Sequence, residues 1–365
     1  MQHTVVIAPD SFKGTLAARG VAEAIAEGWR SVRPGDTLRL LPQADGGEGT
    51  LDAVQSAVPG SVRRDAGLVS GPDGRRVRGE WLELPGGVAV IELAQMCGLP
   101  LMGALDPMAA TTYGLGEVIR AALETGVRKI VIGLGGSAST DGGAGALEAL
   151  GLVAHGGGLR ASELARLGTL QRGGLVAPPV DGVVLLSDVT APLLGADGAA
   201  QVFGPQKGAA PHQVAALDAG LTRFAELLGG DPTLAGSGAA GGTAYGFAAA
   251  WGASIEPGAA YVARLSGLPD AVADASLLIT GEGSFDSTST TGKVVGHLIA
   301  LADRVDIPVG VIAGRLEVPP VAADGSAIWA TTLTDLAGSS AAAMGDPTRW
   351  LRAAGAEAAR WFAWS

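Results

Sequence analysis

Short runs of β-branched residues and leucine alternate along this chain with longer, alanine-rich segments of helical periodicity. This alternation is typical of α/β proteins, in which helices connect parallel strands. The predicted strands are residues 4–9, 38–42, 129–135, 182–187, 276–281, 308–314 and 327–333. The predicted helices are residues 15–31, 48–57, 114–125, 142–151, 212–228, 290–303 and 347–362. The sequence therefore predicts an α/β fold built on a parallel sheet.

Residues 61–93 depart from this pattern, because their strand-like runs are separated by the turn sequences GPDG and PGG. Such turns predict antiparallel pairing. A chain of 365 residues also exceeds the usual size of one domain. We expect a Rossmann-like domain of residues 1–61 and 270–365, with a second, mixed α/β domain of residues 62–269 inserted into it. An alternative assigns residues 111–150 to the first domain as well.

Composition excludes several classes of function. The formal net charge is −11 and no block of lysine or arginine occurs, which argues against binding to nucleic acid or to a membrane surface. No apolar stretch approaches the length of roughly 18 residues that a membrane span needs. A single cysteine, Cys97, excludes an intramolecular disulfide and is expected to be a small buried apolar residue rather than a reactive thiol. With no export signal at the N-terminus, we expect a cytoplasmic protein.

Lysine is rare, since only Lys13, Lys129, Lys207 and Lys293 stand among the 25 basic residues. Three of these lysines have a glycine neighbour, in FKG, QKG and TGK. A compact ammonium group beside bare backbone is typical of phosphate binding, and chance proximity is the alternative. Lys129 is expected to be a solvated charge.

Several polar clusters begin where a predicted strand ends. Ligands of open α/β sheets bind at this carboxyl edge, where helix N-termini also favour anions. In the second cluster, Gly46, Gly47 and Gly49 would let backbone amides approach an anion or a carboxylate-bound metal, and a surface turn is the alternative. The clusters are APDSFKGT, PQADGGEGT, GLGGSASTDGG, LLSDVTAP and LLITGEGSFDS.

The clusters supply carboxylates and lysines but no histidine. Their acidic residues are Asp10, Asp45, Glu48, Asp141, Asp188, Glu282 and Asp286. The scattered histidines argue against a zinc site and a Ser-His-Asp triad. Hard oxygen ligands without imidazole favour Mg²⁺, and together with lysines and glycine-rich backbone they favour phosphoryl transfer. As alternatives, Asp10 and Asp45 would cap helices, and Asp188 and Asp286 would form turns.

Three glycine-containing motifs resemble nucleotide-binding patterns to different degrees. STSTTGKV fails as a P-loop, because Ser287 and Val294 replace its first glycine and its final Ser/Thr. GLGGSA, residues 133–138, fits the dinucleotide fingerprint, but no acidic residue lies near residue 153 to bind a ribose. GSGAAGGTAYG, residues 236–246, fits a phosphate loop and close packing of elements equally well.

In order, and over nearly the whole chain, APDSFKGTL, QADGGEGT, GLGGSASTDGGAGALEALG, SDVTAPLLGADGAAQVFGPQKGA, GAAGGTAYG and LLITGEGSFDS…GK resemble the type I glycerate kinase family. The resemblance implies transfer of the γ-phosphoryl group of ATP to D-glycerate with Mg²⁺, most often giving 2-phosphoglycerate. It also implies two α/β domains, one of them Rossmann-like, with the active site in the cleft between them.

Candidate roles follow for the residues of these segments. We expect Asp45 or Asp188 to face the glycerate hydroxyl, and Lys13 and Lys207 to bind phosphate or the glycerate carboxylate. Glu282 and Asp286 are the predicted metal ligands. The remaining candidates for substrate or phosphate binding are Asp10, Ser11, Gly46, Gly47, Glu48, Gly135, Gly136, Ser137 and Lys293.

The chain departs from the family pattern at three positions. Ser284 and Thr288 stand where the family usually has arginine and glutamine, and Asp106 replaces a more usual asparagine. Two alternative functions stay open. The fit of GLGGSA leaves a dinucleotide-dependent oxidoreductase, and the changes at Ser284 and Thr288 leave a sensor that binds glycerate without turnover. The expected partners are small molecules, and the expected assembly is a monomer or a homodimer.

Overall fold

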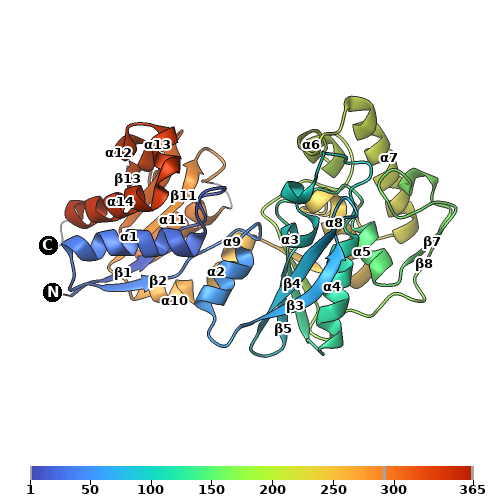
Figure 1. Ribbon diagram of the computed structural model, residues 1–365, viewed down its shortest axis with the longest axis horizontal. Helices are drawn as coiled ribbons and strands as arrows, with labels where there is room; N and C mark the ends of the chain where they lie inside the picture. Colours follow the sequence, from blue (N-terminus) through green and yellow to red (C-terminus); the bar gives the residue numbers. More distant parts are fainter. Residues whose placement is uncertain (1, 291–292, 363–365) are drawn as a thin grey trace. The chain divides into compact units, whose positions relative to one another are not determined.

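The computed structural model describes residues 2–290 and 293–362, which form two compact units (Figure 1). The first unit comprises the described residues up to Asp45, the segment Asp52–Pro59 and the described residues from Gly258 onward. The second unit comprises Gly46–Leu51 and Gly60–Pro257, so it also contains residues 111–150. Each unit is built around its own sheet. The predicted boundaries of folding domains at residues 61/62 and 269/270 stay a prediction.

The first unit contains a five-stranded parallel sheet in the order β13-β12-β11-β1-β2. Val5 of β1 lies opposite Leu277 of β11 on one side and Leu38 of β2 on the other. The strands are β1 (Thr4–Ile7), β2 (Thr37–Leu40), β11 (Leu277–Phe285), β12 (Val309–Leu316) and β13 (Trp329–Thr332). The parallel, doubly covered sheet confirms the α/β prediction for this part of the chain.

Helices cover both faces of this sheet because alternate strand residues point to opposite sides. Val5 and Ile7 pack with α1 and α14, and Val6 and Ala8 pack with α9, α10 and α11. Helices α1 and α14 lie side by side in Figure 1, and a Cβ on Gly28 would lie 1.9 Å from the carbonyl oxygen of Arg352. The helices are α1 (Ala18–Val32), α9 (Gly258–Leu265), α10 (Leu268–Ala273), α11 (Val294–Val305), α12 (Leu333–Ala337), α13 (Ser340–Gly345) and α14 (Pro347–Trp361), and α2 (Thr50–Ala57) belongs to this unit from Asp52 onward.

The second unit contains a mixed six-stranded sheet in the order β10-β9-β6-β5-β4-β3. The pairs β3/β4 and β4/β5 are antiparallel, which confirms the prediction for residues 61–93, and the other neighbours are parallel. The strands are β3 (Val62–Ser70), β4 (Arg76–Leu84), β5 (Val88–Glu92), β6 (Lys129–Gly133), β9 (Val183–Leu186) and β10 (Ser254–Glu256), with a separate pair of β7 (Val153–His155) and β8 (Thr169–Gln171).

Helices of the second unit enclose a single large core around Ile91, Ile130 and Ile132. Leu115 and Ile119 belong to this core, and they lie on α4, which agrees with the predicted helix 114–125. The helices are α3 (Ala94–Cys97), α4 (Tyr113–Glu124), α5 (Ala144–Ala149), α6 (Ala199–Phe203), α7 (Pro211–Leu228) and α8 (Ala239–Trp251), with 3₁₀ helices at Leu99–Leu101, Leu164–Arg166 and Pro205–Lys207. No helix in the described part of the chain combines the length and apolarity needed to span a bilayer.

Two sequence predictions need correction or completion. The polar cluster GEGSFDS was expected to begin where its strand ends, but β11 continues to Phe285 because Glu282 and Ser284 pair with Ala313 and Arg315 of β12. The start of the predicted helix at 290–303 includes residues 291–292, which lie outside the described residues. The described helix begins at Val294.

Candidate active site

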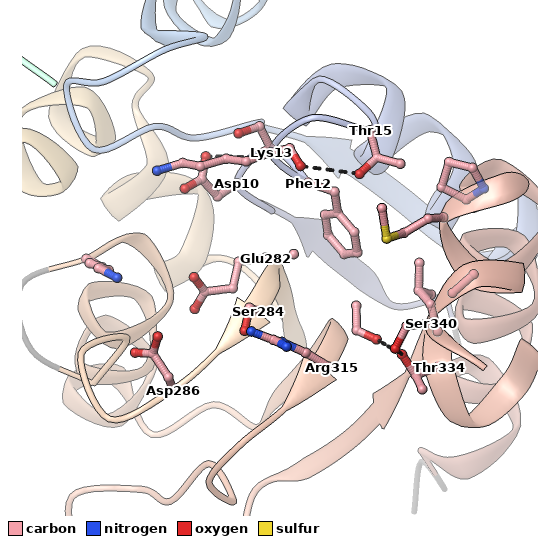
Figure 2. A pocket seen from close by; sticks show the side chains of 18 of the residues that line it. Asp10, Phe12, Lys13, Thr15, Glu282, Ser284, Asp286, Arg315, Thr334 and Ser340 are labelled. Carbon is pink, nitrogen blue, oxygen red and sulfur yellow. Dashed lines mark hydrogen bonds between the residues drawn. The ribbon is translucent and has the colours of Figure 1, made fainter. Parts of the chain in front are cut away.

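A pocket of about 420 Å³ lies in the first unit, at the carboxyl end of its parallel sheet (Figure 2). Each strand of the sheet contributes residues from its last positions or from the segment that follows it, and for β2 this residue is Asp45. This edge is the usual ligand site of an open α/β sheet. The predicted site residues that line the pocket are Asp10, Ser11, Lys13, Asp45, Glu282, Asp286 and Lys293.

The segment after β1 is held in place by backbone hydrogen bonds. The amide of Asp10 donates to the carbonyl of Gly281 over 2.8 Å, which fixes Asp10 beside β11. The backbone of Phe12 and that of Leu16 then bond to each other in both directions, closing a tight loop. Lys13 is exposed on this loop. Its ammonium group therefore stays hydrated and charged in the free protein and is accessible to an anion.

Carboxylates gather at one end of the pocket. Asp10 is 8% exposed, and burial followed by the charge of Asp45 raises the pKa of Asp10 to about 7. Burial also raises the pKa of Glu282, and its Oε1 has no hydrogen-bond partner among the described residues. The backbone amide of Ser11 and then the charge of Lys13 oppose the shift at Asp10, and the Ser289 hydroxyl followed by the charges of Lys293 and Lys13 opposes the shift at Glu282. A bound cation would stabilise the ionised form of these buried carboxylates and so lower their pKa values.

Asp286, unlike Glu282, accepts several hydrogen bonds within the turn that follows β11. Asp286 Oδ1 accepts hydrogen bonds from the backbone amide and hydroxyl of Thr288, at 2.7 and 2.6 Å, and these bonds lower the pKa of Asp286. Thr288 Oγ1 in turn accepts from Lys293 Nζ over 2.6 Å. Thr288, one of the departures from the family pattern, therefore organises this turn. Asp286 shows the turn-forming behaviour that was its alternative role.

Ser284, the other departure in this segment, faces a guanidinium group. Arg315 of β12 donates from Nε to Ser284 Oγ over 3.0 Å and pairs with Glu317 at 2.9 Å. Figure 2 shows Arg315 between the acidic end of the pocket and Thr334. Arg315 was missed in the sequence, although it directly follows the predicted strand 308–314.

The donor set of this pocket suits Mg²⁺ only in part. Within the described part of the chain, no three His, Cys, Asp or Glu side chains come together as a metal site. Mg²⁺ commonly uses only one or two protein carboxylates together with phosphate oxygens and water, so a smaller donor set suffices. Glu282 fits such a role through its unpartnered buried oxygen, and Asp10 offers a second carboxylate.

A second polar cluster lies in the second unit around Lys207, at the end of the 3₁₀ helix Pro205–Lys207. Its Nζ donates to Ser137 Oγ over 2.9 Å and to the carbonyl of Ser139. Burial lowers the pKa of Lys207 to about 7, opposed by the negative charge of Asp141. The buried hydroxyls of Ser139 and Thr140 have no hydrogen-bond partner among the described residues. Lys207 thus lies beside two buried hydroxyl groups that are available to bind a ligand.

Asp141 is an internal support of this cluster. It is fully buried, and its Oδ2 accepts from both the backbone amide and the hydroxyl of Thr112 at 2.8 Å. Its Oδ1 accepts from the amide of Gly143 over 3.1 Å. Burial nevertheless raises the pKa of Asp141. These bonds tie the loop after β6 to the start of α4.

The glycines of QADGGEGT and GLGGSA approach each other. The amide of Gly135 donates to the carbonyl of Gly46 over 3.1 Å, and a Cβ on Gly135 would lie 2.4 Å from the Cα of Gly47. Gly46 has φ +90° and its Cβ would lie 2.8 Å from that of Leu186. Close approach of backbone therefore explains these glycines. An anion at Gly46, Gly47, Gly135 or Gly136 stays a prediction.

Two further predicted residues lie apart from these contacts. Glu48 is exposed, whereas Glu92, which sequence reasoning missed, accepts from the amides of Gly49 and Leu51 at 3.1 and 3.2 Å. Glu92 ends the apolar run VAVIE, and its place at the end of a strand-like run was the only feature of the sequence that pointed to a role for it. Asp188 lies half-buried, two residues beyond β9.

The segment GSGAAGGTAYG adopts a helical conformation interrupted at Ala240, Gly241 and Gly242, which have positive φ angles. A Cβ on Gly241 would lie 2.1 Å from the carbonyl oxygen of Ser139. Of its two interpretations, the structure supports close packing. Cys97 is fully buried and burial raises the pKa of its thiol, which agrees with an unreactive apolar residue.

The chain is similar to known proteins over most of its length. A model of the glycerate kinase family matches residues 5–363. The glycerate 2-kinase of Escherichia coli K12 is 40% identical over 330 residues, which cover 86% of this chain and 85% of that protein. The glycerate kinase of Halalkalibacterium halodurans is 39% identical, covering 86% of each chain. A crystal structure of a Salmonella typhimurium LT2 protein assigned as glycerate kinase 2 superposes with a TM-score of 0.83 at 36% identity, covering 99% of this chain and 98% of that one.

The match to the family model extends over both units and includes every segment on which the family resemblance was based. Their identities lie well above the level at which only the fold is shared. The chain belongs to the glycerate kinase family.

Proposed function

We propose that this protein transfers the γ-phosphoryl group of ATP to D-glycerate and gives 2-phosphoglycerate. The observation that carries the proposal is the pocket at the carboxyl edge of the first sheet, which combines Asp10, Asp45 and Glu282 with Lys13 and Lys293 in a chain of this family. Phosphoryl transfer depends mainly on positioning and charge neutralisation, and these are the groups that supply both.

Lys13 and Lys293 are proposed to bind phosphate oxygens. Both line the pocket, and Lys13 is exposed. A lysine ammonium group acts as a compact charge that neutralises a phosphoryl group without demanding a fixed geometry. Ser11 lines the same pocket and offers a hydroxyl to the same anion.

Mg²⁺ is proposed to bind at the carboxylates. Glu282 would hold it through the buried Oε1, with Asp10 as a second donor, and bound Mg²⁺ supplies neutralisation of phosphate charge. Asp286 was predicted as the other metal ligand, but its Oδ1 already accepts three hydrogen bonds from Thr288 and Ser289. We therefore propose Asp286 as a weaker metal ligand than Glu282.

The glycerate hydroxyl that accepts the phosphoryl group must lose its proton to a base. Asp45 and Asp188 remain the two proposed candidates for this base. Asp45 lines the pocket of the first unit, and Asp188 follows β9 in the second. For Lys207 we propose a role at the carboxylate of glycerate, supported by the adjacent unused hydroxyls of Ser139 and Thr140. Removing the base should lower kcat far more than it changes KM for ATP.

The comparisons support neither alternative function. A dinucleotide role for GLGGSA is disfavoured further because Gly135 packs against Gly47, where a cofactor would need space. The free, buried Cys97 supports a cytoplasmic location, and the acidic composition supports the absence of nucleic-acid binding; both stay part of the proposal, as does a monomeric or homodimeric state.

Incubation with ATP, Mg²⁺ and D-glycerate tests the proposal, with ³¹P NMR to identify the product. The proposal expects ADP and 2-phosphoglycerate in equal amounts. Formation of 3-phosphoglycerate would correct the position of transfer only, whereas ADP release without any phosphoglycerate would reject the proposed reaction. L-Glycerate in place of D-glycerate serves as the control for the acceptor.

A further inference from the structure

The pocket of the first unit has two chemically different ends. Its charged end lies beside β1 and β11 and beyond β2, where Asp10, Lys13, Asp45 and Glu282 gather. Its other end lies beyond β12 and β13, which are the next strands along the sheet. Figure 2 shows the labelled carboxylates of Asp10, Glu282 and Asp286 on one side, and Phe12, Thr334 and Ser340 on the other.

The second end is mainly apolar. Leu333 and Ala343 are 2% and 4% exposed, and Phe12 is 3% exposed, so they form a rigid floor. Met344 is 66% exposed at the same pocket although it is a large apolar residue. A flexible methionine at the opening of an apolar pocket can adapt to a flat ligand.

Helix α13 presents one face to this end. Ser340, Ala343 and Met344 follow the i, i+3, i+4 spacing that places side chains on the same side of a helix, and all three line the pocket. Ser339 caps the helix, since its side chain accepts from the amide of Ala342 over 3.2 Å. The face is therefore fixed by local structure before any ligand binds.

Hydroxyl groups stand at the border of the apolar end. Thr334 Oγ1 donates to the carbonyl of Gly314 over 2.8 Å and lies 3.3 Å from Ser340 Oγ. Arg315, near the end of β12, brings a positive charge between the two ends of the pocket. The pocket thus passes from carboxylates and lysines, through a guanidinium, to an apolar recess edged by hydroxyls.

We infer that the apolar end holds the nucleobase of the phosphate donor, between Met344 and the floor formed by Phe12, Leu333 and Ala343. A nucleobase has apolar faces and polar edges, and its nucleotide continues into a polyanion, which matches this order of surfaces. Glycerate is too small and too polar to use the recess. A volume of about 420 Å³ lies within the usual range for ligand pockets. This inference rests on the proposed function, because the phosphate donor of that reaction is the ligand.

The test compares binding of ADP with binding of inorganic pyrophosphate, which lacks the nucleoside, by titration calorimetry in the same Mg²⁺ buffer without glycerate. The wild-type protein should bind ADP more tightly than pyrophosphate. Ser340→Phe places a ring at an exposed position that lines the pocket, so it should weaken ADP binding by about tenfold or more and leave pyrophosphate binding unchanged. Met344→Ser should weaken ADP binding in the same selective way.

Ala341→Phe is the matched control, since Ala341 is an exposed neighbour on the same helix and does not belong to the pocket lining. It should leave both affinities unchanged, and circular dichroism should show that all variants fold. Unchanged ADP affinity in Ser340→Phe and Met344→Ser, or an equal loss for ADP and pyrophosphate, would overturn the inference. Because no turnover is measured, selective loss of ADP binding in a protein that forms no phosphoglycerate would support the nucleobase site while rejecting the proposed reaction.

Discussion

Lys207 donates a hydrogen bond from Nζ to Ser137 Oγ over 2.9 Å, and only 3% of this lysine is exposed. A buried ammonium group loses its hydration, and this loss lowers the pKa of Lys207 to about 7. The lysine therefore changes charge near neutral pH within a loop whose neighbouring hydroxyls at Ser139 and Thr140 have no partner among the described residues.

Replacing Lys207 by methionine should change how stability depends on pH. The pKa of Lys207 is about 7 in the folded protein, against 10.5 for a lysine in the unfolded chain, so the unfolded chain binds more protons between these values. The free energy of unfolding of the wild type should therefore rise with pH in this window, by up to about 1.4 kcal/mol per pH unit. Lys207→Met should lack this rise. Urea unfolding of both proteins at pH 7, 8 and 9 measures it, and parallel slopes would contradict the account.

Asp10 should have the opposite pH dependence. Its pKa is about 7 in the folded protein, against 3.8 for an aspartate in the unfolded chain, so the folded state binds more protons between pH 4 and 7. The wild type should lose stability as pH rises through this window, by at most about 1.4 kcal/mol per pH unit. Asp10→Asn should remove this loss and be the more stable protein at pH 8 without Mg²⁺. Thermal unfolding at pH 5–8 measures the stability of both proteins. Equal stability of the wild type and Asp10→Asn at pH 8 would contradict a destabilising buried charge at Asp10.

Glu282→Gln should impair Mg²⁺ binding selectively. Its Oε1 is buried without a partner among the described residues, whereas Asp286 already accepts bonds from Thr288 and Ser289. We expect the Mg²⁺ concentration for half-maximal activity to rise by about tenfold or more in Glu282→Gln. Asp286→Asn should show a smaller increase, and Glu23→Gln, on the exposed part of α1, none. Equal effects of Glu282→Gln and Glu23→Gln would exclude Glu282 as a ligand.

Two glycines of the same segment should respond differently to alanine. Gly46 and Gly49 both have φ +90°, but only at Gly46 would the added Cβ collide, 2.8 Å from Leu186 Cβ. The described residues leave open space around a Cβ at Gly49. Gly49→Ala should cost about 1 kcal/mol of unfolding free energy from backbone strain, and Gly46→Ala about 2 kcal/mol or more. Denaturant unfolding measures both, and equal losses would show that packing at Leu186 is unimportant.

Local patterns allowed most of the fold to be predicted. The alternation of apolar runs and helical segments located the parallel strands because burial repeats with a fixed period. β11 was predicted too short, because Glu282 and Ser284 interrupt the apolar pattern and their partners on β12, Ala313 and Arg315, are distant in sequence. Helix α14 agrees with the predicted helix 347–362, whereas the short helices α12 and α13 were missed, although Thr332 and Ser339 cap them through their side chains.

The charged end of the pocket could be predicted because its carboxylates and lysines follow recognisable strands. The apolar end could not, since Met344 and Ala343 resemble ordinary helix residues until the fold places α13 beside the pocket. Glu92 was missed for a similar reason. The amides that donate to it, those of Gly49 and Leu51, lie 43 and 41 residues earlier in the sequence.

The rate of phosphoglycerate formation by Lys13→Ala tests most directly whether the charged end of this pocket carries the transfer. The variant should lose at least about a hundredfold in kcat, because an exposed ammonium group is removed from the phosphate site while the fold is kept. Lys129→Ala, which changes a lysine at the start of β6, is the control and should stay within about twofold of wild type. Turnover of Lys13→Ala equal to that of wild type would contradict the account.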